Sequence, residues 1–295
     1  MVRKTCLFLV AALAVVTAEA VDVDALWDFG NPAASEQRFR SALASATGDD
    51  ALILQTQIAR THMLRKDFET ARDQLQSVLP ALQTAGPEAR VRYWLELGRS
   101  YASHQHPRES QTPQSRELAR NAYANALELA QQAGLDGLAV DVIHMFAFVD
   151  TAPTDQLKWN MQALARIAAS DQPGAKRWEA SIRSNAGEAL YDLGRYDEAL
   201  MHFRRAAQLR EQGTSAQATR DAHWQIARVL RVQKHTDEAL ALQHRLESES
   251  AAMGAPRVYI FEELELLYRA KGQEERARSY AEQARQLAAV HAKRH

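Results

Sequence analysis

A pattern that recurs along most of the chain constrains its fold more than any other feature of the sequence. Residues 94–101 read Trp-x2-Leu-Gly-x2-Tyr, and residues 119–126 read Ala-x3-Tyr-x2-Ala. Because residues three, four and seven places apart lie on one face of a helix, each segment predicts a helix with one packed face. The small residues in both segments let the two helices approach closely. The pattern therefore predicts a pair of helices that can stack on similar pairs.

Five further copies of this helix-pair pattern can be aligned with the first. The copy at residues 185–206 is the clearest, because Gly194 ends its first helix and Asp197 and Glu198 begin its second helix at the positive end of the dipole. One anchor residue marks each second helix: Ala71, Ala119, Gln156, Ala199, Ala239 and Ala277. The spacings of 48, 37, 43, 40 and 38 residues predict six pairs of unequal length. In the third copy, over residues 138–170, the pattern leaves the register open by one residue.

These motifs resemble the tetratricopeptide repeat, over about residues 50–290. The resemblance implies an all-α, right-handed superhelical solenoid of about six helix-turn-helix repeats, and it is nearly silent on function. Residues 25–29 and 32–40, with the pairs His144-Met145 and Trp159-Asn160, also resemble segments of a widespread group of uncharacterised exported bacterial proteins of this fold. That group has no assigned activity to carry over to this chain.

Residues 1–20 predict an export signal. Arg3 and Lys4 form a basic start, an apolar stretch follows, and small residues precede a cleavage point after Ala20. An apolar run of about 11 residues is too short to span a bilayer, which needs about 20. We therefore expect an exported protein, periplasmic or secreted, that is not inserted in a membrane after cleavage of the signal.

The remainder of the chain divides into two parts. Residues 21–48 form an N-terminal segment in which Asn31, as N-cap, and Pro32 begin a capping helix. Residues 49–295 form the repeat array. A polar stretch with two prolines, residues 104–116, predicts an inserted surface loop within that array.

Composition and the absence of known motifs exclude several kinds of chemistry. The single cysteine, Cys6, lies in the export signal, so the mature chain lacks disulfides, thiolate zinc sites and cysteine nucleophiles. The 36 basic and 37 acidic residues nearly balance, which argues against a general nucleic-acid binder. No nucleotide-binding, zinc-protease or serine-hydrolase motif occurs. We expect no catalytic residues, no metal and no cofactor, and we interpret His104 and His106 as residues of a solvated loop.

The concave face of such a solenoid is the predicted binding surface, because stacked first helices line it. The repeat register places eight candidate groove residues there: Arg60, Arg99, Asn185, Glu188, Trp224, Gln225, Arg228 and Arg231. The planar guanidinium groups suit carboxylates, so we expect a positive lining that attracts acidic segments or chain ends. The alternative is that these arginines form an ordinary solvated helix face.

Three functions follow from this architecture. The first is a non-catalytic scaffold or adaptor in the cell envelope that binds a protein or peptide in the concave groove. The second is a structural assembly subunit that forms homo-oligomers and leaves the groove empty. The third is an enzyme, if His144, Trp159, Asn160 and Asn185 gather around one deep pocket.

Overall fold

The computed structural model describes residues 20–292, and within this range the regular structure is entirely helical. The expected export signal lies outside the described residues, apart from Ala20 at its end. None of the helices in the described range is long and apolar enough to cross a membrane.

Six pairs of neighbouring helices make up most of the described chain, as the repeat pattern predicts. The pairs are α3 (Gly48–Leu64) with α4 (Phe68–Val78), α5 (Pro87–Tyr101) with α6 (Pro113–Gln132), α7 (Asp136–Val149) with α8 (Pro153–Ala169), α10 (Glu179–Asp192) with α11 (Tyr196–Glu211), α12 (Ala216–Val232) with α13 (Thr236–Ala252), and α14 (Val258–Ala270) with α15 (Glu274–Ala292). Each pair also packs against the next, so the core continues from one pair to the next.

Five further elements of the described chain precede or interrupt this regular array. They are α1 (Val23–Leu26), α2 (Pro32–Leu43), α9 (Pro173–Lys176) and the 3-10 turns η1 (Leu79–Gln83) and η2 (Arg108–Ser110). Asn31 caps α2, since its side chain accepts a hydrogen bond from the backbone N–H of Ala34. The inserted loop is shorter than the sequence predicts, because Thr112 caps α6 and that helix already begins at Pro113.

The anchor residues of the second helices set the packing within each pair. The five anchor alanines are fully buried. Gln156 replaces alanine in the third pair and donates a hydrogen bond to the carbonyl of Ala147 at 3.1 Å. Four residues beyond the anchor stand Tyr123, Asn160 and Phe203, all buried, so the third pair keeps the register of its neighbours.

Glycine in the first helix makes room for the aromatic ring in two pairs. A Cβ on Gly98 would lie 2.3 Å from Cε1 of Tyr123, and a Cβ on Gly187 would lie 2.5 Å from Cε1 of Phe203. Real side chains do not tolerate such contacts. The close approach of these helices therefore requires glycine, in agreement with the small residues of the sequence pattern.

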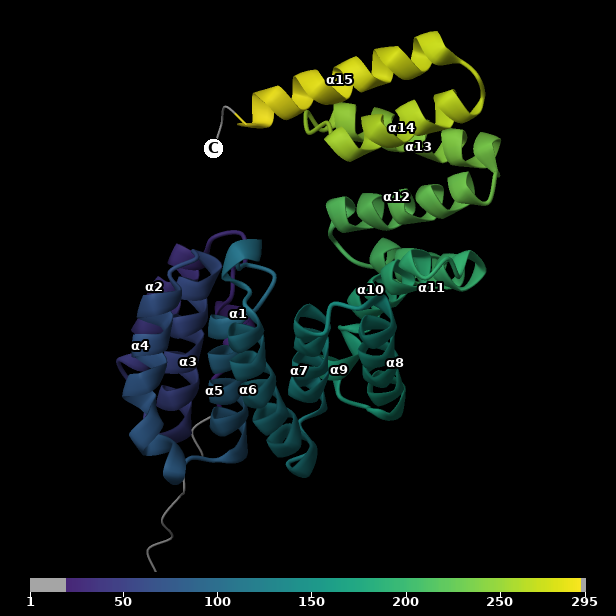
Figure 1. The fold of residues 1–295 in the computed structure, drawn as a ribbon. Helices are drawn as coiled ribbons and strands as arrows, with labels where there is room; N and C mark the ends of the chain where they lie inside the picture. Colours follow the sequence, from purple (N-terminus) through teal and green to yellow (C-terminus); the bar gives the residue numbers. More distant parts are fainter. Residues whose placement is uncertain (1–19, 293–295) are drawn as a thin grey trace, which may run out of the picture.

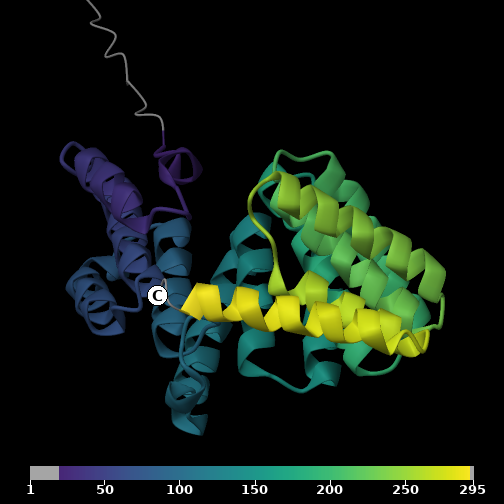
Figure 2. The ribbon, with the colours of Figure 1, turned by 90° about the horizontal axis from the view of Figure 1, so that it is seen from above.

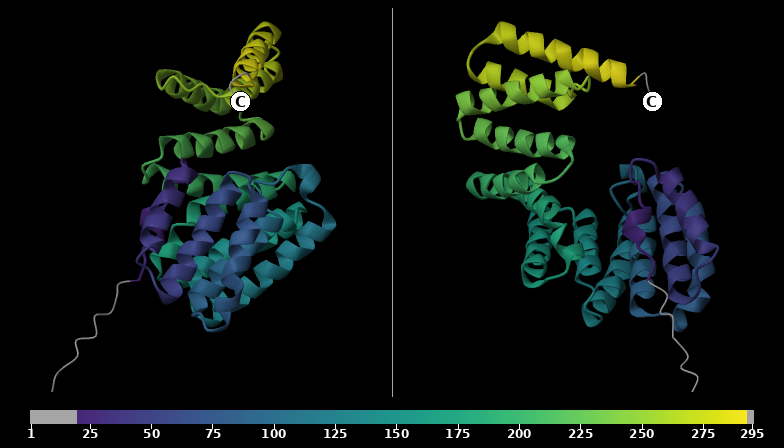
Figure 3. Two further views of the ribbon diagram at one scale, coloured as in Figure 1. Left: turned by 90° about the vertical axis from the view of Figure 1, so that its left-hand side faces the viewer. Right: turned by 180° about the vertical axis from the view of Figure 1, so that it is seen from behind.

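The array curves strongly along its length. Helices α2 to α6 stand side by side, whereas α12 to α15 run across them at the other end (Figure 1). Seen from above, α15 runs back from the far side of the molecule toward the N-terminal helices (Figure 2). The view from behind shows the same open curve, with α7 to α10 at the bend (Figure 3, right). The first helices of the pairs follow one another along this curve.

Candidate functional site

The first helices of the six pairs, α3, α5, α7, α10, α12 and α14, form what we call the inner row. A polar contact joins each of them to the next: Arg60–Glu96 at 3.8 Å, Arg99–Asp141, His144–Asn185 at 3.1 Å, Glu188–Arg228 at 3.0 Å and Arg231–Glu263 at 2.5 Å. All eight groove residues that the sequence predicts lie on inner-row helices. The inner row is therefore the candidate functional surface.

A buried ion cluster occupies the inner row at α5 and α7. Arg99 donates to Glu96 at 2.6 Å and also to Asp141, and the Glu96 side chain is only 1% exposed. Burial alone would raise the pKa of Asp141, but the positive charges of Arg99 and Arg60 hold that pKa below its ordinary value. Arg99 is thus committed to internal carboxylates and is not available to a ligand.

Arg60 lies beside the same cluster in a different environment. The rings of Trp27 and Phe29 stack at 4.7 Å, and the guanidinium carbon of Arg60 lies 5.4 and 5.3 Å from their centroids. The indole N–H of Trp27 donates to Gln57 at 3.1 Å, which fixes the aromatic pair against α3. Burial, together with the nearby charge of Arg99, lowers the pKa of Arg60. Within the described residues Arg60 makes no hydrogen bond, and its nearest carboxylate is at 3.8 Å.

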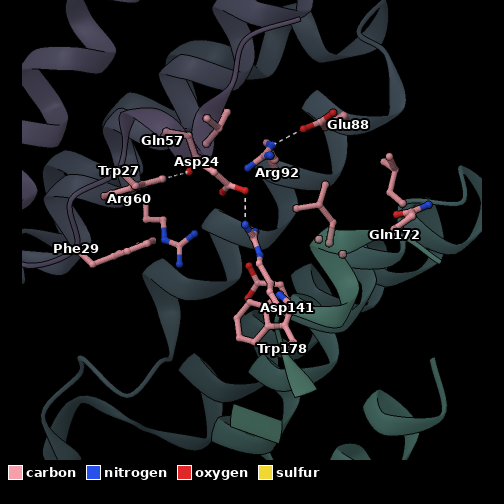
Figure 4. Close-up of a pocket in the computed structure, with 16 residues that line it drawn as sticks. Asp24, Trp27, Phe29, Gln57, Arg60, Glu88, Arg92, Asp141, Gln172 and Trp178 are labelled. Carbon is pink, nitrogen blue, oxygen red and sulfur yellow. Dashed lines mark hydrogen bonds and ion pairs between the residues drawn. The ribbon is translucent and has the colours of Figure 1, made fainter. Parts of the chain in front are cut away.

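A cavity of about 480 Å³ opens in front of Arg60, and we call it the N-terminal cavity. Its walls come from residues 23–29, from inner-row helices α3, α5 and α7, and from the α9 region. Figure 4 shows Arg60 and Arg92 on one side of this space and Trp178 on another. An ion pair between Asp24 and Arg177 connects the N-terminal segment to the end of α9 across the cavity.

The inner row at α10, α12 and α14 is more open. The guanidinium carbon of Arg228 lies 4.5 Å from the centroid of Tyr191 and 4.6 Å from that of Trp224. Arg228 also donates to both carboxylate oxygens of Glu188 at 3.0 Å, and Gln225 donates to one of them at 2.9 Å. These side chains are only partly buried, so parts of them remain accessible to a partner, although the indole nitrogen of Trp224 is itself buried.

The charge of the inner row differs from the expected positive lining. Each of the four predicted arginines has a carboxylate of a neighbouring helix within 4 Å. The charges along this face are therefore balanced. Of the residues that line the N-terminal cavity, the predicted groove set contains Arg60 alone; the side chains that it lacks include Trp27, Phe29, Arg177 and Trp178. Trp27 and Phe29 fall in a segment noted above only for its resemblance, and nothing in the local sequence indicates their contact with α3.

The four residues of the possible enzyme site do not surround one pocket. Asn160 and Asn185 line a hollow of about 130 Å³ at α7, α8 and α10. The amide of Asn185 donates to Nδ1 of His144 at 3.1 Å, and burial lowers the pKa of His144 to about 4. Trp159 instead stacks on Phe146 at 4.3 Å. The geometry that would favour the enzyme hypothesis is thus not formed.

The two loop histidines have different surroundings. His104 is exposed, whereas His106 stacks on Phe68 at 3.8 Å and accepts a hydrogen bond from the N–H of Ser103. The interpretation of His106 as a solvated residue is therefore wrong, because the loop folds back over α4. Across residues 20–292, no cluster of three or more histidine, cysteine, aspartate or glutamate side chains is placed to hold a metal.

Comparison with known proteins agrees with this architecture. Residues 178–245 match the tetratricopeptide repeat family. No curated protein sequence matches the chain. The structure resembles a signal transduction ATPase with numerous domains (STAND) protein with a tetratricopeptide repeat sensor from Pyrococcus horikoshii, with a TM-score of 0.65 and 13% identity, over 90% of this chain and 41% of that one. It also resembles the apo form of the quorum sensor NprR from B. thuringiensis, with a TM-score of 0.54 and 13% identity, over 88% of this chain and 83% of that one.

At this level of identity the two structures establish a shared fold only. This chain spans about two fifths of the length of the STAND protein. The family match identifies tetratricopeptide repeats at residues 178–245, and the six helix pairs and the structural likeness show that the fold is an all-α solenoid of tetratricopeptide-repeat type.

Proposed function

We propose that this protein is a non-catalytic scaffold in the cell envelope that binds a segment of another protein along the inner row. The observation that carries the proposal is the open surface around Arg228, where a guanidinium group lies against Tyr191 and Trp224 and shares Glu188 with Gln225. Tyrosine, tryptophan and arginine are the residues that contribute most binding energy at protein interfaces. Here they come from two neighbouring repeats, so one extended or helical segment can contact both.

The comparisons support recognition as the general role. The two similar structures are described as a repeat sensor and a quorum sensor, and the solenoid fold presents a long surface built from successive repeats. The balanced charges of the inner row change the expected partner. Because Arg228 and Arg231 already have carboxylate neighbours, we expect aromatic and hydrogen-bonding contacts to contribute more than attraction of acidic segments.

Site-specific photo-cross-linking tests the binding surface. A benzoylphenylalanine in place of Tyr191 on the inner row should give a discrete adduct in intact cells. The matched control is Met201, which is 58% exposed on α11, the second helix of the same pair. The same cross-linker there should give no adduct of that mass. Adducts from Met201 alone would move the binding face to the other side of the pair, and adducts of twice the chain mass would favour the assembly subunit.

Export is the part of the proposal that depends only on residues 1–20. N-terminal sequencing of the protein purified from its native host should begin within a few residues of Val21. Recovery in the envelope or extracellular fraction should accompany this result. An intact Met1 on protein from the cytoplasmic fraction would contradict it, without bearing on the binding surface.

A further inference from the structure

The N-terminal cavity has features of a site for a compact ligand. Its volume of about 480 Å³ falls within the range of about 300 to 1,000 Å³ typical of small-molecule pockets. Its walls come from parts of the chain as distant as Asp24 and Arg177, which form an ion pair. That ion pair and the aromatic pair of Trp27 and Phe29 border the cavity, so its shape differs from that of a continuous groove.

Hydrogen-bond donors face this space without partners. Arg60 makes no hydrogen bond within the described residues, although four fifths of its side chain is removed from solvent. Arg92 uses its Nε to bind Glu88 at 2.8 Å, and its two terminal nitrogens make no hydrogen bond with any described residue. These nitrogens are not sealed from solvent, so a ligand in the cavity can reach them, and a carboxylate is the group that best satisfies planar guanidinium donors.

The charges around the cavity determine which carboxylate fits. The ionised side chains of the lining are three arginines and three carboxylates: Arg60, Arg92, Arg177, Asp24, Glu88 and Asp141. Their sum is zero. A ligand that carries only a negative charge would make the filled cavity negative. A ligand that carries one positive and one negative charge would leave it neutral. The aromatic side chains of Trp27, Phe29 and Trp178 add an apolar wall for the remainder of the ligand.

We propose that the N-terminal cavity binds a small zwitterion, an α-amino acid with an apolar or aromatic side chain. Its carboxylate is held by Arg60 and Arg92, its ammonium group faces the carboxylates of the lining, and its side chain lies against the aromatic wall. This activity is separate from the binding of a protein segment around Arg228. The inner row then carries two sites, one for a metabolite and one for a partner.

The indole N–H signals of the five tryptophans provide a direct test by NMR. Trp27 and Trp178 line the cavity, and the other three, Trp94, Trp159 and Trp224, serve as internal controls. The twenty L-amino acids are added one at a time, up to about 10 mM, to the purified protein. We expect apolar or aromatic amino acids to shift the Trp27 and Trp178 signals selectively. If none of the twenty does so, the proposal is wrong.

Analogues of phenylalanine test the charge argument. 3-Phenylpropionate lacks the ammonium group and phenethylamine lacks the carboxylate, and each should bind at least about ten-fold more weakly than L-phenylalanine or the best amino acid of its class. Equal binding of 3-phenylpropionate would replace the zwitterion with a simple carboxylate. An acetylated nonapeptide that shifts the Trp27 and Trp178 signals and binds more tightly than the amino acids would assign the cavity to the binding of a protein segment. That result would also overturn the proposal.

Two variants and one matched control locate the ligand. Arg60→Gln should weaken binding at least about ten-fold, and Phe29→Ala should weaken it several-fold with the fold retained, since Phe29 is 59% exposed. Arg231→Gln is the control, because Arg231 is an ion-paired arginine of the inner row outside the cavity. Unchanged affinity in Arg60→Gln would contradict the proposal. Cross-linking at Tyr191 reports on the partner site independently, so failure of one proposal is distinguishable from failure of the other.

Discussion

Arg99 and Arg228, one in each half of the inner row, contact their surroundings in different ways. In the N-terminal half, formed by α3, α5 and α7, Arg99 is 8% exposed and lies between two carboxylates that are equally buried. In the C-terminal half, formed by α10, α12 and α14, Arg228 is 19% exposed and lies against aromatic rings beside a half-exposed Glu188. The first arrangement fixes neighbouring repeats to each other. The second leaves the faces of its side chains free to contact another molecule.

The largest difference between the halves should appear when each arginine is replaced by leucine. Arg99→Leu leaves Glu96 and Asp141 buried with Arg60 as the one remaining arginine beside them, and should lower the free energy of unfolding by about 3 to 5 kcal/mol. Arg228→Leu should lower it by about 1 kcal/mol, because Glu188 keeps Gln225 and solvent as partners. Urea unfolding at pH 7 measures both. Equal losses of unfolding free energy in the two variants would show that burial of the arginine does not distinguish the two halves.

Acid should lower the free energy of unfolding through His144, which lies on α7 near Asp141 and Arg99 of the buried ion cluster. Its folded-state pKa of about 4 lies below the ordinary value of 6.5, so between these pH values the unfolded chain binds a proton that the folded chain does not. Stability is therefore complete above pH 6.5 and falls as the pH approaches 4, by about 2 to 3 kcal/mol in total. Unfolding midpoints of the wild type and His144→Gln between pH 4.5 and 7 test this. The same slope in both proteins would exclude His144 as the cause.

Replacing the glycines that contact the aromatic rings should lower stability to a similar extent in the two halves. Gly98→Ala forces a Cβ into the ring of Tyr123, and Gly187→Ala does the same to Phe203. Each change should cost about 1 to 3 kcal/mol through overpacking, with similar values in the two halves. Thermal unfolding followed by circular dichroism provides the comparison. A cost in one half only would mean that the helices of the other pair can move apart.

The smallest effects are expected where an exposed arginine of a second helix pairs with a carboxylate. Arg204 lies 4.0 Å from Glu238 in the C-terminal part, with both side chains more than half exposed, and Arg120 contacts Asp150 in the N-terminal part. Arg204→Ala and Arg120→Ala should each change stability by less than about 0.5 kcal/mol. A larger loss of stability for Arg120→Ala in urea unfolding would extend the buried ion cluster of α5 and α7 to α6, the helix that carries Arg120.

The repeated part of the fold could be predicted because its packing depends on neighbours in sequence. Ala199 and Gly194 report on a helix pair that is complete within about 30 residues. The third pair shows the limit of this reasoning, since Gln156 and Asn160 stand where alanine and an aromatic residue are expected. Their register is evident only once the neighbouring pairs are in place.

The candidate site could be predicted only in part. The periodicity placed Arg99 and Arg228 on the inner row, but the partners Asp141 and Glu188 lie on other helices, about 40 residues away in each case. The aromatic wall of the N-terminal cavity depends on Trp27 folding back onto Gln57, and no helical periodicity connects these residues. Contacts of this kind are set by the curvature of the assembled array, which the single repeats do not encode.

The contact between Asp24 and Arg177 spans 153 residues in a molecule whose packing otherwise proceeds from one helix pair to the next. Chain closure over such a distance is slow, so this contact should form after the repeats between its ends. Both side chains are more than half exposed, so the pair contributes little free energy. Detachment of the N-terminal segment must also break the hydrogen bond from Trp27 to Gln57 and expose the buried Val23, but it leaves every helix pair folded. In hydrogen exchange, we expect the amides of residues 21–29 to exchange well before those of α5 or α7. Molecules can then enter and leave the cavity at a rate that is set by fraying of the N-terminal segment and not by unfolding of the solenoid.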